Sequence, residues 1–485
     1  MTDTDPDSFD VIVIGGGPAG ENAADYAGKG GLTTALVETE LVGGECSYWA
    51  CMPSKALLRP VEVLALAKAL PGIPVADDDR LELEPVLSRR DEFTHNHDDS
   101  SQVEWAEDAG ITVIRGNARI IGVRSVDVTS SEGTVRALSA RHAVVIATGT
   151  SAAVPDLPGL RDAKPWTSRD VTNLHQVPDR IVVIGGGVVG CEATTWLRGL
   201  GAKVTLLARE DRLLVRTEPF AGDLLAEAFR DNGVDVRLGA AVTEVRRGQV
   251  RTTEEGRIRG SEVTVVVDGE EIRADEVLCA TGRAPRSEGL GLDVIGLKDG
   301  GYVETDDSMT VTGVDGDWLY AVGDVNGRAL LTHMGKYQAR VCGDVIAARA
   351  NGRSTEAARF RATSDHGAVP QVTFTDPQVA SVGQSEAEAR DSGAAIRCVE
   401  YDLASVAGAA LLRDGYQGRA KLVVDIDGET LLGATFVGPE VGELVHAATI
   451  AVVGKVPLDV LWHAVPSYPT ASEIWLRLLE TWRAK

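Results

Sequence analysis

Residues 11–31 read VIVIGGGPAGENAADYAGKGG, a short β-branched run followed by a glycine-rich turn and a helix-compatible stretch. The same order returns at residues 181–201 as IVVIGGGVVGCEATTWLRGLG. Strand, glycine turn and helix in this order open a dinucleotide-binding α/β unit. One glycine fingerprint is a weak signal, but two copies, each followed by a second apolar strand, are hard to obtain by chance. The sequence therefore predicts two dinucleotide-binding units.

The glycines of each turn have separate tasks. The first permits a tight bend, the second lets the backbone approach a pyrophosphate, and the third lets the helix pack on the strand. These positions are Gly15, Gly17 and Gly20 in the first copy, and Gly185, Gly187 and Gly190 in the second. The strand after the first copy ends at Glu38, about where a ribose-binding acid should lie. The first unit is therefore expected to bind an adenine dinucleotide with free ribose hydroxyls.

The corresponding strand of the second unit ends differently. It places Ala208 and Arg209 at that point, with Arg212 and Arg216 close behind. Arginine suits a 2′-phosphate, which favours NADPH over NADH. Glu210 leaves NADH possible, and ordinary surface arginines are the alternative reading.

The stretches around the two units complete the outline. Two helices are expected around residues 56–70 and 85–109, followed by a β-rich stretch that ends at HAVVIATGT (142–150). Residues 151–180 are rich in proline and aspartate and indicate a domain boundary. After residue 355 strands such as VPQVTFT alternate with helices near 442–454 and 472–483. We expect this part to form a separate α+β domain.

Composition limits the class of protein. The 485 residues suit two or three domains, and 44% apolar residues allow large cores. A formal charge of −24 repels nucleic-acid phosphates and anionic lipids, so neither is an expected partner. The acidic start MTDTDPDSFD lacks the pattern of a signal peptide, and no apolar stretch has membrane-spanning length. A cytoplasmic protein is expected.

Two of the six cysteines lie close together, in the segment GGECSYWACMPSK at residues 43–55. Four residues separate Cys46 from Cys51, at the expected start of a helix. The other four cysteines are isolated in the sequence, which argues against a structural zinc site. Buried inert cysteines are the alternative to a redox pair.

The two fingerprints, Glu38, the GGxCxxxxC segment and PSK together resemble the class I pyridine nucleotide-disulfide oxidoreductases, which include dihydrolipoamide dehydrogenase, glutathione reductase and mercuric reductase. The resemblance implies an α/β fold with two Rossmann-like domains and a C-terminal α+β dimerisation domain. It implies FAD binding by residues 1–153 and 283–358, NAD(P)H binding by 154–282, and a homodimer interface in 359–485.

The resemblance also assigns residues to each cofactor. IATGT at 146–150 is similar to the family's crossover segment, LYAVGDV contains the aspartate that holds the ribityl chain of FAD, and LLTHM at 330–334 runs along the flavin. Beyond the fingerprint glycines and Glu38, the implied FAD residues are Gly44, Lys55, Ala118, Thr148, Gly149, Asp324 and Thr332. The implied NAD(P)H residues include Val188, Glu192, Arg209, Arg216 and Gly282.

The implied catalytic groups are the cysteines and an ion pair. Lys55 and Glu192 should pair beside the flavin. Cys51 should face the flavin as a thiolate, and Cys46 should attack the acceptor. The partner subunit of the homodimer would complete a composite active site.

Two departures from the family lie near these groups. Tyr48 and Ala50 replace the usual asparagine and glycine between the cysteines, which leaves the geometry of the pair open. Val188 stands where several relatives have a tyrosine that gates the nicotinamide pocket, and mercuric reductases resemble the chain there.

The third departure is the largest. Thiol-disulfide reductases of the family have HxHPTxxE near the C-terminus, whereas this chain reads PSYPTASE. Glu473 is kept, but Tyr468 replaces the histidine that protonates the leaving thiolate. A tyrosine is a poor base at neutral pH, so turnover of linear disulfides should suffer. Mercuric reductases also have tyrosine there, yet the cysteine pair that those enzymes carry near the C-terminus is absent from this sequence.

Four other histidines have separate expected roles. His463 is a candidate to replace the missing acid-base group, although no family position matches it. His446 is expected to be structural, and His95 with His97 reads as a polar turn rather than a metal site.

The main hypothesis is an FAD-dependent NAD(P)H oxidoreductase that reduces a Cys46–Cys51 disulfide and then a small acceptor, a metal ion or a specialised disulfide. One alternative is direct transfer from reduced flavin to quinone or oxygen. A flavin-binding redox sensor and a dihydrolipoamide dehydrogenase subunit are the others.

Overall fold

The computed structural model describes residues 6–76 and 78–484, and the chain divides into two compact units. The first unit consists of Met1–Met52, Asp91–Ser151 and Arg283–Asp365. The second consists of Pro53–Arg90, Ala152–Gly282 and His366–Lys485. Each unit is therefore assembled from three separate stretches of chain.

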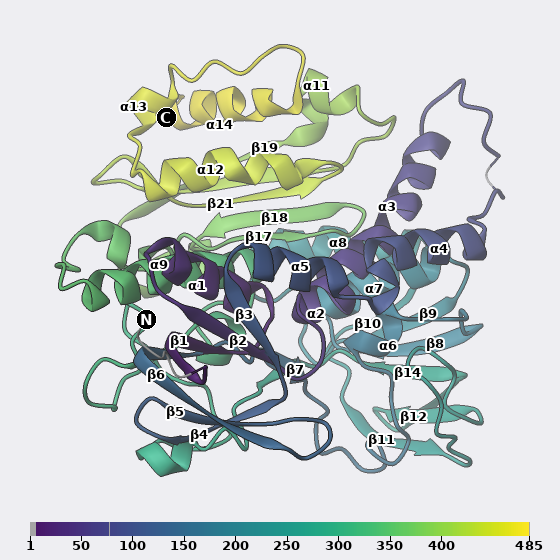
Figure 1. Ribbon diagram of the computed structural model, residues 1–485. Coiled ribbons are helices and arrows are strands. Elements are labelled where there is room, and N and C mark those ends of the chain that lie inside the picture. The colour runs from purple at the N-terminus through teal and green to yellow at the C-terminus, as the bar shows by residue number, and fades with distance from the viewer. Residues whose placement is uncertain (1–5, 77, 485) are drawn as a thin grey trace. The chain divides into compact units, whose positions relative to one another are not determined.

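A mixed sheet forms the centre of the first unit (Figure 1). Its order is β3-β2-β1-β6-β5-β4, and β16 also pairs with β6. Strand β1 lies parallel to both β2 and β6. Val11, Ile12 and Val13 are fully buried, as expected for a strand covered on both faces. The bounds are β1 Ser8–Ile14, β2 Thr34–Glu38, β3 Ile111–Arg115, β4 Asn117–Gly122, β5 Ser125–Thr129, β6 Val135–Ile146 and β16 Leu319–Ala321.

Helices α1 (Pro18–Lys29) and α9 (Thr332–Ala350) pack closely against each other (Figure 1). The close approach depends on small residues. A Cβ atom added at Gly343 of α9 would lie 2.5 Å from Tyr26 Cβ of α1, and one added at Gly30 would lie 2.2 Å from Ala347 Cβ. Buried alanines of α1 complete the packing. These contacts fix the two helices relative to each other.

The second unit contains the second glycine fingerprint. Its parallel sheet has the order β10-β9-β8-β14, and a separate antiparallel sheet has the order β11-β12-β13. The strands are β8 Arg180–Ile184, β9 Lys203–Leu207, β10 Asp235–Arg237, β11 Val242–Arg247, β12 Val263–Val267, β13 Glu270–Ala274 and β14 Glu276–Cys279. Helices α6 (Ser168–Thr172), α7 (Val188–Gly199) and α8 (Pro219–Asp231) also belong to this part.

A five-stranded antiparallel sheet forms the C-terminal part of the second unit, in the order β17-β18-β21-β20-β19 (Figure 1). The strands are β17 Pro370–Thr373, β18 Gln378–Gly383, β19 Ile396–Asp402, β20 Arg419–Asp425 and β21 Thr430–Gly438. Helix α12 (Leu444–Val453) packs on β21, and α14 (Ile474–Arg483) packs on β19. The expected α/β fold with a C-terminal α+β part is confirmed.

The expected helix over residues 85–109 is wrong as a single element. The structure has α4 (Leu83–Phe93) and α5 (Ser100–Asp108), separated by a short turn at His95–His97. All three turn residues have positive φ, at 49°, 52° and 59°, which breaks a right-handed helix. Helix α3 (Cys51–Lys68) begins at the second cysteine, where the cysteine segment predicts a helix start. Among the described residues, no helix is long and apolar enough to cross a membrane.

Candidate active site

The first glycine loop lies between β1 and α1. Gly15 has φ +105°, and a Cβ atom there would lie 2.5 Å from the Ala147 oxygen. A Cβ atom on Gly20 would lie 1.9 Å from the Gly15 oxygen, whereas one on Gly17 would meet no atom within 4 Å. The loop is therefore closed at its first and third glycines and open at its second. The open position is at the N-terminus of α1, where backbone N–H groups and the helix dipole favour a phosphate.

Glu38 ends β2 beside this loop. Its Oε2 accepts a hydrogen bond from the Gly16 N–H at 2.6 Å, and its Oε1 accepts one from Glu40 N–H at 2.7 Å. Gly44, with φ +57°, also lies against the loop, because a Cβ atom there would be 2.8 Å from Gly17 Cα. The structure thus brings Glu38 and Gly44 to the glycine turn.

Asp324 lies in the 3₁₀ turn η3 (Gly323–Asn326) and accepts a hydrogen bond from the Thr150 hydroxyl at 2.7 Å. Burial raises the pKa of Asp324, and the Thr150 hydrogen bond opposes this effect. In the same crossover segment, the Thr148 hydroxyl is buried and has no hydrogen-bond partner among the described residues. Gly149 has φ +68° with open space at its Cβ position.

These groups fit an adenine dinucleotide of flavin. Open space at Gly17 suits a pyrophosphate, and the unpartnered Thr148 hydroxyl with the buried Asp324 carboxyl suits the hydroxyl groups of a polyol chain. Ala118, by contrast, is buried in β4 within an apolar core cluster. Among the described residues, no group of three or more His, Cys, Asp or Glu side chains is arranged to hold a metal ion.

Cys46 lies in the short helix α2 (Gly44–Tyr48), Cys51 is the first residue of α3, and both are present as thiols. The two side chains contact each other: a hydrogen bond with Cys51 raises the pKa of Cys46, and burial raises it further. Cys51 Sγ lies 3.2 Å from the Thr332 hydroxyl at the first residue of α9. The fold therefore joins the pair to a residue far away in the sequence.

The bulky residues between the cysteines are accommodated without separating the pair. Tyr48 is fully buried, and its hydroxyl donates to the Val42 oxygen at 3.0 Å. Its ring meets Trp49 edge-on at 5.7 Å, and His97 lies 5.5 Å from the Trp49 ring. The left-handed turn at His95–His97, which sequence reasoning described only as polar, therefore packs against the cysteine loop.

A buried acid on α1 was missed by sequence reasoning. Burial raises the pKa of Glu21 from the usual 4.5 to about 7, and Lys336 of α9 opposes this effect. The Glu21 Oε1 atom is buried without a hydrogen-bond partner in the described structure. Lys336 also lowers the pKa of Cys46 and lies one helical turn after Thr332. Lys336 of α9 thus acts electrostatically on both Glu21 and Cys46.

In the second unit, Lys55 and Glu192 form the expected ion pair, with Nζ and Oε2 2.8 Å apart. The Glu192 side chain is buried, and its Oε1 accepts a hydrogen bond from the Phe374 N–H at 2.9 Å. The Lys55 ammonium lies 4.8 Å from the centre of the Phe374 ring. Three stretches of chain therefore fix this pair, which sequence spacing alone could not show.

The second glycine loop repeats the first. Gly185 has φ +126°, with its Cβ position 2.3 Å from the Ala280 oxygen, and the Cβ position of Gly190 lies 1.9 Å from the Gly185 oxygen. Gly187 is again open. Val188 is the first residue of α7, and Gly282, with φ +143°, also has open space at its Cβ position.

The arginines after β9 differ in their contacts. Arg209 pairs with its neighbour Glu210 at 2.7 Å and its side chain is 85% exposed. Arg212 has a buried Nε atom with no hydrogen-bond partner in the described structure. Arg216 is exposed. The group is therefore available to an anionic ligand, and Arg212 adds a donor that the sequence alone did not single out.

A cavity of about 730 Å³ lies beside Lys55 in the second unit. Phe374 and the segment Pro469–Ser472 are among its lining residues. Tyr468, next to this segment, is 76% exposed, whereas Glu473 is buried and binds Arg477 at 2.5 Å. His463 is exposed.

The family profile for pyridine nucleotide-disulphide oxidoreductases matches residues 9–346, and that of the family's dimerisation domain matches residues 369–478. The chain belongs to this family. Because its members use FAD and NAD(P)H, the chain is a flavoprotein oxidoreductase that uses both. The expected fold, enzyme class and cofactors are thereby confirmed.

Several relatives span nearly the whole chain. A mercuric reductase of Staphylococcus aureus is 30% identical over 471 residues, covering 96% of this chain and 81% of the relative. A dihydrolipoyl dehydrogenase of Chlorobaculum tepidum is 32% identical, covering 98% and 97%. The solved structure of RclA from Escherichia coli, a HOCl-induced flavoprotein disulfide reductase in complex with Cu(II), superposes with a TM-score of 0.82 at 25% identity, covering 98% and 99%.

Proposed function

We propose that the protein passes electrons from NAD(P)H through FAD to a Cys46–Cys51 disulfide, and from the resulting dithiol to a small acceptor. The contact between the two cysteine side chains, at the start of α3 and beside Thr332, carries this proposal. We propose the division expected from the sequence, in which residues 1–153 and 283–358 bind FAD, 154–282 bind NAD(P)H and 359–485 form the dimer interface.

Bound FAD supplies a two-electron carrier that accepts hydride from NAD(P)H and reduces a disulfide. The chain's own residues hold and orient it. Glu38 accepts hydrogen bonds from ribose hydroxyls, the Gly17 region binds the pyrophosphate, and Asp324 binds the polyol chain. Lys55, which Glu192 and the Phe374 ring hold in place, would supply the positive charge that the family resemblance assigns to the flavin.

The cysteines divide the chemistry between them. Reduction of the disulfide by two electrons and one proton gives one thiol and one thiolate. The Thr332 hydroxyl, 3.2 Å from Cys51 Sγ, is placed to donate a hydrogen bond to a thiolate there. Cys46 then attacks the acceptor; contact with Cys51 and burial raise its pKa in the reduced pair, and Lys336 opposes this rise.

We infer that the acceptor is a soft metal ion or a specialised disulfide rather than a linear disulfide. Tyr468 stands where a histidine would protonate the leaving thiolate, and tyrosine is a poor base at neutral pH. Similar proteins include mercuric reductases, and RclA is described as a Cu(II) complex. Both descriptions support metal ions as an acceptor class.

NADPH is the proposed electron donor, because Arg209, Arg212 and Arg216 follow the second glycine unit and suit a 2′-phosphate. A homodimer is proposed because the dimerisation part exposes several large apolar side chains: Ile450, Val453, Val460 and Val465, the last of them 85% exposed. Tyr468 and Glu473 would then complete the site of the partner. We place the protein in the cytoplasm, where thiols stay reduced.

Anaerobic titration with NADPH tests the dithiol. The wild type should develop the long-wavelength absorbance of a thiolate beside oxidised flavin, and Cys51→Ser should lose it. Cys398→Ser, on β19, is the matched control and should retain it. A wild type without this band refutes the dithiol relay.

Steady-state assays then separate the acceptors. The turnover rate of the purified flavoprotein is measured with metal ions, disulfides and quinones as acceptors, and with NADPH or NADH as donor. Quinone reduction that survives in the double variant Cys46→Ser, Cys51→Ser would favour direct transfer from flavin instead.

A further inference from the structure

A buried polar chain connects α9 to the turn that carries Asp324, and it begins at Gln338. The Gln338 side chain has no exposed surface. Its Oε1 accepts hydrogen bonds from the Gly323 N–H at 2.8 Å and from Asn326 Nδ2 at 2.9 Å. These two donors are the first and last residues of η3. One carbonyl oxygen therefore holds both ends of the turn whose second residue is Asp324.

Asp365 fixes the orientation of this amide. Gln338 Nε2 donates to Asp365 Oδ2 at 3.1 Å. Because an ionised carboxylate only accepts hydrogen bonds, it selects the amide orientation that points Nε2 at Asp365 and Oε1 at the turn. The Asp365 side chain is 2% exposed, so its charge requires a buried partner.

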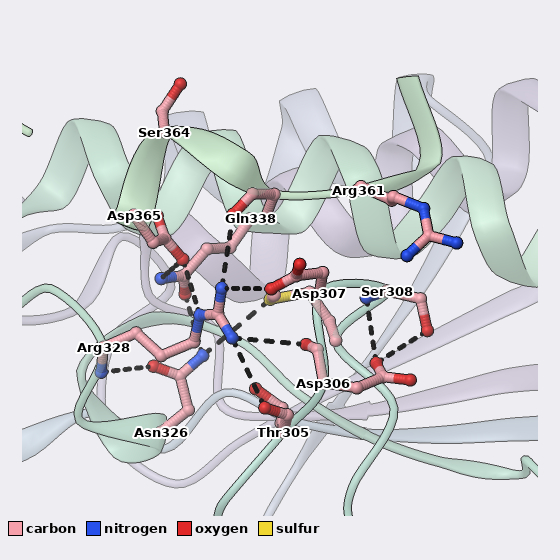
Figure 2. Close-up of polar contacts among 12 residues, drawn as sticks. Thr305, Asp306, Asp307, Ser308, Asn326, Arg328, Gln338, Arg361, Ser364 and Asp365 are labelled. Carbon is pink, nitrogen blue, oxygen red and sulfur yellow. Dashed lines mark hydrogen bonds and ion pairs between the residues drawn. The ribbon is translucent and has the colours of Figure 1, made fainter. Parts of the chain in front are cut away.

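Arg328 is that partner. Its Nε lies 2.7 Å from Asp365 Oδ2, and its Nη2 lies 2.9 Å from Asp307 Oδ1 (Figure 2). The same guanidinium donates to three backbone oxygens, those of Thr305, Asp306 and Ala362, at 3.3, 3.4 and 3.2 Å. Figure 2 shows it at the centre of the cluster. The backbone N–H of Arg328 also donates to Asn326 Oδ1 at 3.0 Å, so the hydrogen-bond network contacts η3 a second time.

The turn itself depends on this support. Gly323 has φ +77°, and a Cβ atom there would lie 2.9 Å from Ala19 Cβ of α1. The turn is closed by the Gly327 N–H, which donates to the backbone carbonyl oxygen of Asp324 at 3.0 Å. Without Gln338, the buried Gly323 N–H would lose its acceptor, and Asn326 Nδ2 would keep the Ala321 oxygen at 3.2 Å and Met309 Sδ at 3.9 Å. The Asp324 carboxyl would still accept from the Thr150 hydroxyl, but it would be carried by a less firmly fixed turn.

We propose that Arg328, Asp365 and Gln338 form a positioning relay that orients the Asp324 carboxylate for the hydroxyl-rich chain of the flavin nucleotide and thereby sets the affinity for FAD. The inference rests on the proposed role of Asp324. None of the three relay residues is assigned a contact with the cofactor, so each acts through the turn.

The test measures the dissociation constant for FAD by reconstituting apoprotein and following flavin fluorescence. Gln338→Leu keeps the size of the side chain and should raise the constant roughly ten- to hundred-fold. Asp365→Asn should raise it several-fold, and it tests the relay even where Gln338→Leu does not fold. Arg340→Gln, exposed on the same helix, is the matched control and should leave the constant unchanged.

A double-mutant cycle distinguishes positioning from general stability. If the relay acts through Asp324, Gln338→Leu should have little further effect in an Asp324→Asn background. Equal effects in both backgrounds, or unchanged affinity in Gln338→Leu and Asp365→Asn, would overturn the relay.

The same cycle separates this inference from the proposed function. Unchanged FAD affinity in Asp324→Asn alone would remove the role of Asp324, and with it the relay. The thiolate band in the NADPH titration tests the dithiol independently. An intact band together with additive effects would refute the relay alone.

Discussion

Replacing Glu21 with glutamine should stabilise the protein, and increasingly so as the pH rises. In the folded protein, burial raises the pKa of Glu21 to about 7, against the usual 4.5. Between these values the folded state binds more protons than the unfolded state, so the free energy of unfolding falls as the pH rises. At 1.36 kcal/mol for each tenfold change in proton affinity, the full difference is about 3 kcal/mol above pH 7. Glutamine does not titrate and avoids this loss.

Urea unfolding checks this expectation at several pH values between 5 and 8.5, with equal protomer concentrations and saturating FAD because both affect apparent stability. The stability advantage of Glu21→Gln should be small at pH 5 and grow to about 3 kcal/mol near pH 8.5. Glu107→Gln, at an exposed site on α5, is the control and should show no such trend. An advantage that stays constant with pH would contradict the buried, protonated state of Glu21.

Four further substitutions have definite expected outcomes. Gly20→Ala places a Cβ atom 1.9 Å from the Gly15 oxygen and should prevent folding, which circular dichroism would show. The Cβ atom of Gly17→Ala meets no atom within 4 Å, so this variant should fold but bind FAD more weakly in a fluorescence titration. Glu276→Gln breaks a fully buried pair with Arg247 and should cost about 3–5 kcal/mol in urea unfolding. Tyr468→His should increase kcat for a linear disulfide in steady-state assays. An unchanged kcat would show that the residue at this position does not limit turnover through acid-base chemistry.

The sequence predicted much of the fold because its signals are local. Apolar β-branched runs marked the strands before both glycine turns, and the steric role of Gly15 and Gly20 is visible in spacing alone. The segment from Cys46 to Lys55 indicated the redox pair through its resemblance to the family. Each of these signals depends on neighbours within a few residues.

The missed features depend on tertiary packing. Glu21 reads as an ordinary helical acid, and only the packing of α1 against α9 makes it buried. The contact between Cys51 and Thr332 joins residues far apart in the chain. The left-handed turn at His95–His97 has no glycine to announce it. Such features need the folded environment, which spacing and propensity do not contain.

Strand β6 has a consequence for synthesis on the ribosome. Val144, Val145 and Ile146 pair on one side with β1 and on the other with β16 at Leu319–Ala321. The closing strand is made only after all of residues 152–282. Until then a nascent chain presents an open, apolar strand edge, the kind of surface that recruits other chains. N-terminal fragments that end before Leu319 should therefore aggregate, and chaperone protection matters most during this interval.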